Sequence, residues 1–570
     1  MLTGHVRLGK LLFVIISIKL FIMVMFFSYD SSNEVVPPER FVIIDELLVD
    51  KSDEPSWTEQ LKLIRKELPS FPLEEMLRRS AETPKCGQVP GPLNIDFSND
   101  YWQTFLNDNL TYHIYGAYYD NREMMGEAPV VRVLTMINYY GQHEKMRYPA
   151  TFCQLWFRDR VEPVVVNVTD HKLIWLWGGS SAYSYPTLLS CCLPKTNGSN
   201  AQEAPEMVSL VTQPCDKSRN LMRVTYEPDE SSTAVTDVAQ KQQPEQQQEQ
   251  TNNTQLQRKP LRFMVCLKCM DFIYRDLSWR LIEWLELIRI LGADKVVFYD
   301  CQIHPNITRV LNDYMQTSPG FVELRPISMA RGEPHAMPHL QHYAMHADTL
   351  NRLLNEMIPY NDCFYRNMYK YDYIGAFDID EVIMPLGNVT NWTDLIDLAY
   401  KVPDYQRETW NCSEWVSFCF RNVYFPAYPE RPKVYKQLPS FYYMLQHVER
   451  VAEHSDRFSA TKCLHSTRYT IGLHNHFPLF RADTGECEAK SVPIQYAQLQ
   501  HYREPEDKTL LLDNPIIDDS IWRFQPLLQQ RVYAQYERLG FLPSVEQVLI
   551  AKEQRHKDDE LQLNKSISMG

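Results

Sequence analysis

Residues 371–385 read YDYIGAFDIDEVIMP, a short apolar run that ends in three carboxylates. Residues 373–377 are apolar and aromatic and are bounded by charge, which predicts a buried strand rather than a helix. In an extended chain alternate residues share a face. We therefore expect Asp378 and Asp380 to point the same way and Glu381 to point across the sheet.

Two oxygen ligands at the end of a strand favour a hard divalent cation that bridges the carboxylates and a substrate diphosphate. Open α/β sheets bind ligands outside the carboxyl ends of their strands, where this cluster lies. Asp-x-Asp by itself is a common pattern, and a strand end that enters solvent also explains it. Three clustered acids after a buried strand are nevertheless costly unless a cation or donors compensate them. We predict a metal and diphosphate site at Asp378 and Asp380.

The same letters fit a second class of enzyme, the aspartate-nucleophile phosphatases. There Asp378 would form an aspartyl phosphate and Asp380 would act as general acid. Those enzymes also need a Gly-Asp-x-x-x-Asp type segment for magnesium, and the sequence downstream contains none. The metal and diphosphate interpretation is therefore favoured.

The composition indicates a large soluble body. The chain has 570 residues, enough for two or three domains with substantial cores. Its formal net charge of -14 argues against nucleic acid as a partner, because phosphate binding requires a basic surface. Length and net charge do not indicate the oligomeric state.

The N-terminus predicts membrane attachment. Three basic residues precede residues 11–27, LLFVIISIKLFIMVMFF, whose only charge is Lys19. This predicts a cytosolic tail over 1–10 and a single-pass signal anchor over 11–28, with the remaining chain in the secretory lumen. A cleaved signal peptide is the alternative, but no small-x-small cleavage pattern follows the apolar run.

Cysteines and glycosylation sequons agree with a lumenal address. All thirteen cysteines follow the apolar run, and their odd number leaves at least one free or intermolecular when the others pair. Cys266 and Cys269 form a lone Cys-x-x-Cys, which favours packing or disulfides over structural zinc. Nine Asn-x-Ser/Thr sequons predict a glycoprotein: Asn109, Asn167, Asn197, Asn252, Asn306, Asn388, Asn391, Asn411 and Asn564.

Changes in composition divide the lumenal part. We predict a stem over 29–84, a small β-rich accessory domain over 85–226, a Gln-rich disordered linker over 227–260, an α/β domain over 261–545 and a polar C-terminal tail over 546–570. In the α/β part, a strand over 263–267, a helix that Asp276 can cap and Gly292 ends, and a strand over 295–299 form a parallel unit that begins a nucleotide-binding sheet. A helical stretch over 340–358 then leads to the acidic strand end.

Four histidines recur at helical spacing in the entry to that stretch: His335, His339, His342 and His346. The pair His342 and His346 lacks the intervening Glu of a metalloprotease helix. We interpret the group as a polar helix face in preference to a zinc site.

Several motifs in a fixed order resemble glycosyltransferase family 92, a group of Golgi type II membrane enzymes. The motifs are Val265-Cys266-Leu267-Lys268, Glu283-Trp284-Leu285-Glu286, Leu291-Gly292, Phe298-Tyr299-Asp300, Asn361-Asp362-Cys363 with Arg366, Phe377-Asp378-Ile379-Asp380-Glu381, Gly472-Leu473-His474 and His501-Tyr502-Arg503. They extend from about residue 261 to residue 503.

The resemblance implies a GT-A fold, an inverting transfer of galactose in β linkage from UDP-galactose, and Mn²⁺ (or Mg²⁺) held by Asp378 and Asp380. The acceptor would be a glycan on a glycoprotein or glycolipid. It further implies that His501, or alternatively His474, completes the metal ligands. Lys268, Asp300 and Arg503 would bind the donor.

Inversion requires a carboxylate that takes the proton of the acceptor hydroxyl. Glu381 is adjacent to the metal site but is expected to face away, and Glu453 and Asp456 in HVERVAEHSDRF are further candidates that an exposed charged helix would explain equally well. A lumenal carbohydrate-binding protein without turnover is the non-enzymatic alternative, since fold does not fix function.

Overall fold

The computed structural model describes residues 55–542 except 127, 139–146, 176–179, 181, 195–202, 229–259, 331–336, 428–437, 440, 483–484 and 512. The predicted tail, anchor and C-terminal segment, most of the linker and the first part of the stem lie outside the described residues. Contacts divide the chain into two compact units, Met1–Ile64 and Arg65–Gly570. In the described part of the chain, no helix has the length and apolar character needed to cross a membrane.

The stretch predicted to be β-rich forms one nine-stranded sheet. Its strands are β1 (Phe97–Asn99), β2 (Trp102–Asn107), β3 (Leu110–Asp120), β4 (Val130–Ile137), β5 (Phe152–Trp156), β6 (Val164–Leu173), β7 (Tyr185–Cys192), β8 (Met207–Val211) and β9 (Met222–Thr225). The long strand β3 pairs with β2 along its first half and with β9 near its end. Because the order continues β4-β7-β6-β5-β8-β9, the second pairing closes the sheet on itself and covers strand edges that would otherwise be open.

The following part of the chain is a mixed α/β structure around a seven-stranded sheet of order β12-β11-β10-β13-β18-β15-β21. Its strands are β10 (Phe263–Asp271), β11 (Ala293–Gln302), β12 (Val322–Pro326), β13 (Tyr373–Ala376), β15 (Trp415–Phe420), β18 (Lys462–Ser466) and β21 (Cys487–Ser491). A smaller sheet has the order β14-β22-β16, with β14 (Glu381–Pro385), β16 (Asn422–Tyr424) and β22 (Ala497–His501). Two short pairs complete the strands: β17 (Glu449–Arg450) with β23 (Ile516–Ile517), and β19 (Thr470–Leu473) with β20 (Pro478–Arg481).

The order of the four parallel strands determines where a ligand can bind. The chain passes from β10 outward to β11 and β12, then returns to β13 on the other side of β10. The connections therefore leave the carboxyl ends of β10 and β13 in opposite directions. A crevice opens at such a point of reversal, and ligands of open α/β sheets bind there.

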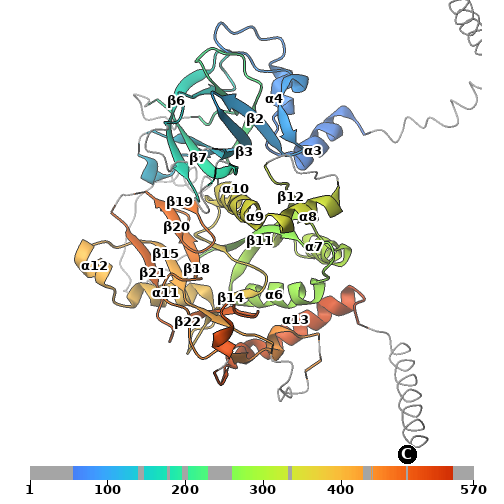
Figure 1. Cartoon of the computed structure of the whole chain (residues 1–570), viewed down its shortest axis with the longest axis vertical. Coiled ribbons are helices and arrows are strands. Elements are labelled where there is room, and N and C mark those ends of the chain that lie inside the picture. The colour runs from blue at the N-terminus through green and yellow to red at the C-terminus, as the bar shows by residue number, and fades with distance from the viewer. Residues whose placement is uncertain are drawn as a thin grey trace, which may run out of the picture. The chain divides into compact units, whose positions relative to one another are not determined.

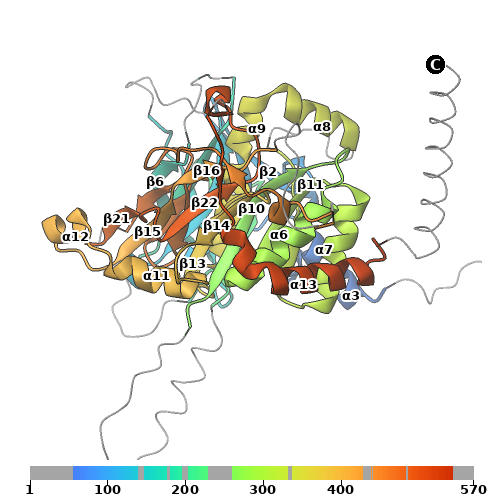
Figure 2. The same cartoon turned by 90° about the horizontal axis from the view of Figure 1, so that it is seen from below.

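Helices precede, connect and follow the strands. They are α3 (Trp57–Glu67) and α4 (Leu73–Arg78) before the sheets, then α6 (Ser278–Leu291), α7 (Pro305–Thr317), α8 (Pro338–Ala347), α9 (Thr349–Asn355), α10 (Met357–Asn367), α11 (Trp392–Lys401), α12 (Tyr405–Trp410) and α13 (Gln525–Arg538). Helix α10 packs on β10, and α6 packs on β11 from the opposite side of the sheet (Figure 1). Helix α13 lies along α6 (Figure 2).

The first parallel unit follows its sequence signals. The carboxylate of Asp276 accepts a hydrogen bond from the Ser278 amide at 3.0 Å where α6 begins. Gly292 ends the helix with φ of 118°, a left-handed conformation that suits glycine. The stretch 340–358, predicted as one helix, is instead divided among α8, α9 and α10. It breaks because Asp348 accepts from the Asn351 amide and caps a new helix.

All thirteen cysteines lie in the described residues, and twelve form disulfides. The pairs are Cys86–Cys215, Cys153–Cys191, Cys266–Cys363, Cys269–Cys301, Cys412–Cys487 and Cys419–Cys463, and Cys192 is free. The prediction that an odd cysteine remains is confirmed. Cys266 and Cys269 belong to different disulfides, which confirms the preference for disulfides over structural zinc.

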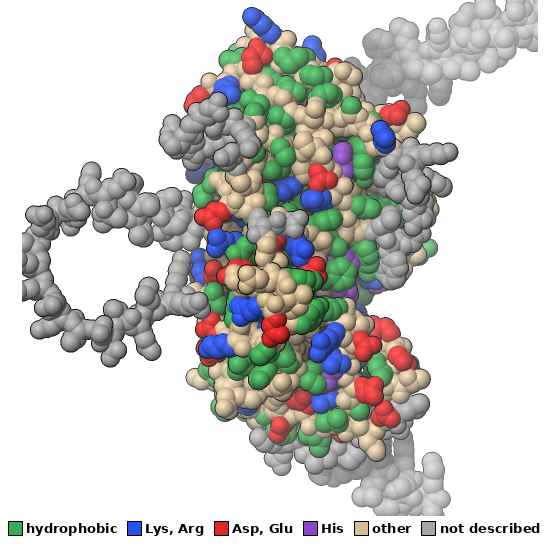
Figure 3. All heavy atoms as spheres, turned by 90° about the vertical axis from the view of Figure 1, so that its left-hand side faces the viewer, with side chains coloured by type: hydrophobic (Ala, Val, Ile, Leu, Met, Phe, Trp, Pro, Cys, Tyr) green, Lys and Arg blue, Asp and Glu red, His purple; other side chains and the backbone are tan. Residues whose placement is uncertain are grey.

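Charges of both signs are distributed over the surface. Figure 3 shows a face on which Lys and Arg side chains alternate with Asp and Glu side chains among apolar ones. On that face the described residues form no continuous basic patch of the kind that binds nucleic acid.

A buried carboxylate joins the closed β-sheet to the α/β structure. Asp362 on α10 accepts hydrogen bonds from the hydroxyl of Tyr118 on β3 and, at 2.6 Å, from the hydroxyl of Tyr299 on β11. Arg366 pairs with the same carboxylate at 2.8 Å. Burial alone raises the pKa of Asp362, but Arg366 and Arg325 outweigh burial and lower the pKa, so the group is ionised at neutral pH.

We expect Asp362→Ala to lower the free energy of unfolding by about 3–5 kcal/mol, because it leaves Arg366 buried without its partner. Tyr118→Phe removes one hydrogen bond to the same carboxylate and should cost less, about 1.5–3 kcal/mol. Denaturant unfolding of the purified full chain measures both. An Asp362→Ala protein as stable as the Tyr118→Phe protein would contradict this account of the junction.

Candidate active site

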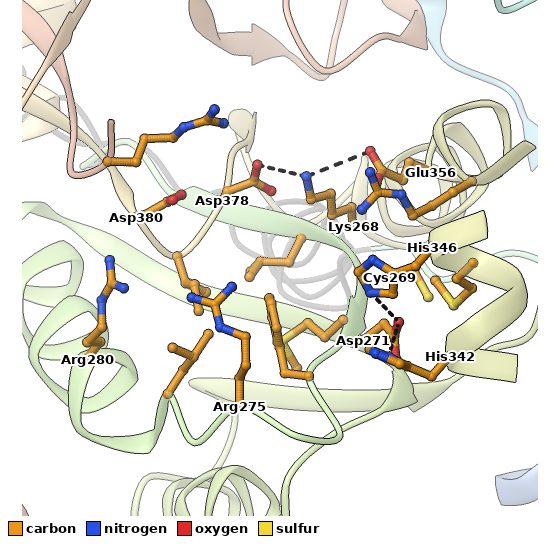
Figure 4. A pocket seen from close by; sticks show the side chains of 18 of the residues that line it. Lys268, Cys269, Asp271, Arg275, Arg280, His342, His346, Glu356, Asp378 and Asp380 are labelled. Atoms are coloured by element: carbon orange, nitrogen blue, oxygen red, sulfur yellow. Dashed lines mark hydrogen bonds and ion pairs between the residues drawn. The ribbon is translucent and has the colours of Figure 1, made fainter. Parts of the chain in front are cut away.

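A cavity of about 370 Å³ lies at the carboxyl ends of β10 and β13, where the strand order reverses. Besides Tyr274, its polar side chains are four carboxylates and a set of basic residues and histidines. These residues are Asp271, Glu356, Asp378, Asp380, Lys268, Arg275, Arg280, Arg352, Arg503, His342, His346 and His501. The segments that supply them are far apart in the sequence, and Figure 4 shows several of them converging on one space.

The acidic triplet has a different shape from the one predicted. Strand β13 ends at Ala376, and residues 378–380 form a turn in which the Glu381 amide donates to the Asp378 carbonyl at 3.1 Å. The expectation that Glu381 points across the sheet is wrong, because it assumed an extended chain through the acids. Asp378 and Asp380 both line the cavity, as predicted, but on a turn.

Glu381 is buried beneath this turn and holds it. Its carboxylate accepts from the Asp378 amide at 2.9 Å and pairs with Lys462 at 3.3 Å. Its other oxygen lies 3.7 Å from Nε2 of His501. The backbone carbonyl of Glu381 accepts from the indole of Trp284 on α6 at 2.8 Å. Glu381 does not line the cavity, so this geometry gives it a positioning role.

His501 closes the acidic side of the cavity. It lies at the end of β22 opposite Glu381, and its Nε2 is 3.9 Å from Asp380 Oδ1. The amide oxygen of Asn422 lies 3.2 Å from Nδ1, and in the tautomer that donates to this oxygen Nε2 keeps its lone pair on the side of Asp380. Burial lowers the pKa of His501 to about 4, with Asp380 opposing, and the imidazole is neutral at physiological pH.

Lys268 connects the two sides of the cavity. Its ammonium lies 3.0 Å from Asp378 and 3.7 Å from Glu356 (Figure 4). Burial alone raises the pKa of the Asp378 carboxyl, but Lys268 and Lys462 outweigh it and hold the pKa well below its usual range. Asp380 has no lysine so close, and burial raises its pKa, although His501 opposes the shift. The pKa values of the two carboxyls therefore shift in opposite directions, although both residues lie on the same turn.

Two of the three residues predicted to bind a donor line the cavity: Lys268 and Arg503. Asp300 does not. Burial raises the pKa of the Asp300 carboxyl to about 6. Burial also raises the pKa of the Tyr101 hydroxyl in the β-rich part, and the nearby charge of Asp300 adds to that shift. The side chain of Asp300 thus belongs near the junction with the β-rich part and not to the described cavity.

His474 lies outside the cavity lining. Its ring packs edge-on against Trp175 at 4.7 Å between centroids and stacks on Phe477 at 4.6 Å. Its Nδ1 accepts from the His476 amide at 3.2 Å. Of the two histidines considered as the third ligand, only His501 lies beside the acidic turn.

The two other candidate bases, Glu453 and Asp456, are exposed on the loop between β17 and β18. The alternative of a charged helix is wrong for this stretch, because it has no helical residues. The loop is fixed next to the site: the Ser455 amide donates to the carbonyl of Asn422, whose side chain orients His501. Neither carboxylate lines the cavity.

Several residues of this site carried no clear sequence signal. Glu356 lies between two helices that were predicted as one, and Arg275, Arg280 and Arg352 are isolated arginines. The residues of the motif Glu283-Trp284-Leu285-Glu286 do not line the cavity but support the elements around it. Glu283 accepts from the amides of Tyr443, Met444 and Leu445, and Glu286 accepts from the hydroxyl of Tyr314 at 2.7 Å.

Residues 262–539 match the model of the family described as glycosyltransferase family 92. A search of curated proteins finds no match to the chain. The matched segment contains the seven-stranded sheet and all the residues that line the cavity.

We expect Lys462→Met to lower the free energy of unfolding by about 3–5 kcal/mol, because Glu381 would stay buried without its cation. Adding Glu381→Gln to Lys462→Met removes the unpaired charge and should recover part of this loss. Denaturant unfolding of the full chain is the measurement. The matched control is Lys508→Met, whose pair with Glu504 is exposed and worth about 0–1 kcal/mol. A loss no larger than the control's would mean that Lys462 does not compensate Glu381.

Proposed function

Residues 262–539 belong to glycosyltransferase family 92, and from this premise we propose a specific reaction. The protein transfers galactose from UDP-galactose, in a metal-dependent and inverting step, to a glycan acceptor on a glycoprotein or glycolipid. The fold of the catalytic part is of the GT-A type. The protein works in the lumen of the Golgi, held by a single-pass anchor over residues 11–28.

One observation carries this proposal: Asp378, Asp380 and His501 meet at one side of a cavity that opens at the strand-order reversal. That place in an open α/β sheet suits a nucleotide. The order β12-β11-β10-β13 supports the GT-A assignment, because it sets a nucleotide-binding half before the acidic turn.

The residues present fit a divalent cation. Asp378 and Asp380 supply carboxylate oxygens, and the Nε2 lone pair of His501 faces Asp380. Carboxylates suit Mn²⁺ or Mg²⁺, and imidazole suits the softer Mn²⁺. When bound there, the ion would neutralise charge on the diphosphate of the donor.

The basic lining supports diphosphate binding. Arg280 is held with its guanidinium over the ring of Tyr443 at 3.7 Å, and Arg503 lines the same cavity beside the acidic turn. Such fixed guanidiniums match phosphate oxygens with paired N–H donors. Lys268 adds a positive charge next to Asp378. These side chains stabilise the leaving UDP without moving, because other contacts already position them.

The base that accepts the acceptor proton is proposed among Glu453 and Asp456, on the loop that Asn422 ties to the site. Both are exposed and therefore open to an acceptor. Glu381 is the weaker candidate because it lies beneath the turn, paired with Lys462.

Two alternatives are less well supported. A phosphatase would use Asp378 as nucleophile, but this carboxylate is engaged by Lys268, and the family match is to glycosyltransferases. A lumenal carbohydrate-binding protein would have no need for the acidic turn, whose burial only costs stability if no cation binds.

We expect Asp380→Asn to lower sugar transfer by more than about 100-fold, since even the partners of metal ligands cost 10–100-fold when removed. Release of UDP by the purified full chain, with a panel of UDP-sugars, Mn²⁺ and a mixed glycan acceptor, measures the rate. A chelator should abolish the same release, and UDP-galactose should be the active donor.

The matched control is Asp159→Asn, the same substitution at an exposed position in the β-rich part, which should leave the rate unchanged. Acceptor-dependent release from another UDP-sugar would correct the donor and keep the transferase. No release from any donor by a folded protein that still binds glycans would instead favour the binding protein.

A further inference from the structure

A second group of metal-ligating side chains lines the same cavity, apart from the acidic turn. Asp271, the last residue of β10, lies between His342 and His346 of α8 (Figure 4). Its Oδ2 is 2.8 Å from Nδ1 of His342 and 3.3 Å from Nε2 of His346. In Figure 4 this group lies on the opposite side of the view from Asp380, with Lys268 between them.

The three ligand atoms are spaced for one ion. All of them lie within 4.8 Å of one another. Ligand atoms about 2.0–2.2 Å from a tetrahedral zinc ion are roughly 3.3 Å apart, so only small side-chain rotations are needed. His342 and His346 are four residues apart on α8 and therefore share one face of the helix. Asp271 comes from the sheet, 71 residues earlier, and completes the set.

The environment of Asp271 points independently to a missing ligand. Its side chain is only 6% exposed, yet among the described residues its Oδ1 finds no hydrogen-bond partner. A buried carboxylate oxygen without a donor costs free energy, because it has lost water and gained nothing in exchange. The two imidazoles both contact Oδ2 and so leave Oδ1 without a partner. A cation that also contacts Oδ1 would relieve it.

The histidines of α8 are not equivalent, which argues against a merely polar helix face. His339 lies against the hydroxyl of Tyr274, whereas His342 and His346 both turn to Asp271. His346 is half-exposed, so an ion can reach the group from solvent. His335 lies outside the described residues.

We propose that Asp271, His342 and His346 bind a zinc ion at the edge of the cavity. Two imidazole nitrogens and one carboxylate are a set that zinc accepts, with a fourth position left for water or substrate. The three residues line the cavity, so an anionic oxygen of a bound substrate could replace that water. The site is separate from the cation proposed at Asp378 and Asp380 and does not depend on it.

Zinc binding by the full chain tests this directly. The purified protein is stripped with a chelator and then titrated with Zn²⁺ alone, and bound zinc is counted by elemental analysis after gel filtration. The Asp380→Asn protein serves as background, because it weakens the other cation site. In this background one zinc should remain, and His346→Ala should weaken its binding by at least about tenfold. Co²⁺ in place of Zn²⁺ should give visible absorption bands that the same substitution removes.

His339→Ala is the matched control, about two turns before His346 on the same helix, and should leave zinc binding unchanged. Asp271→Asn provides a second test from the sheet side, and circular dichroism shows whether each variant is folded. Equal zinc affinity in the folded His346→Ala, Asp271→Asn and His339→Ala proteins would overturn the proposal. Because the readout is bound metal, it is independent of whether the protein transfers galactose.

Discussion

The site depends on the buried carboxylate of Glu381. This one group receives the Asp378 amide, pairs with Lys462 of β18 and lies beside His501 of β22. It thereby fixes the turn that carries both aspartates and relates three separate strands. A buried charge is tolerated only when partners compensate it, so the cation, the amide and the carboxylate form a unit in which each is needed.

The reversal of strand order then determines what can meet at this turn. Lys268 and Asp271 come from the end of β10, and Asp378 and Asp380 follow the end of β13. His501 arrives from the smaller sheet, where it pairs with Glu381 across β14 and β22. Helix α6 supports the arrangement from below through Trp284, whose indole binds the Glu381 carbonyl. The chemistry is thus assembled from segments that the chain separates widely.

The closed β-sheet is joined to this assembly by buried polar contacts. Asp362 receives hydroxyls from both parts, and the indole of Trp102 on β2 donates to the Ser328 carbonyl at 2.9 Å. Trp175 packs edge-on against His474, and Phe477 stacks on the same ring. The sequence alone could not distinguish His474 from a metal ligand, whereas the structure packs it at the junction between the two parts.

The sequence alone determined the local features. The apolar run before the acids makes a strand, Gly292 ends a helix because it tolerates a positive φ, and the odd cysteine remains free. Family-like motifs also indicated the glycosyltransferase segment and directed attention to Lys268, Asp378, Asp380, His501 and Arg503, which all line the cavity.

Only the tertiary structure decided how these residues act together. The alternation of side chains along an extended strand predicted that Glu381 points away from the site. This prediction could not include the turn, which depends on Lys462, a residue 81 positions later. The same limit hid the third member of the histidine group, since Asp271 and α8 meet only when the sheet forms. Spacing along a chain reports neighbours within one helix or strand, whereas ligands for an ion and partners for a buried charge come from packing between elements.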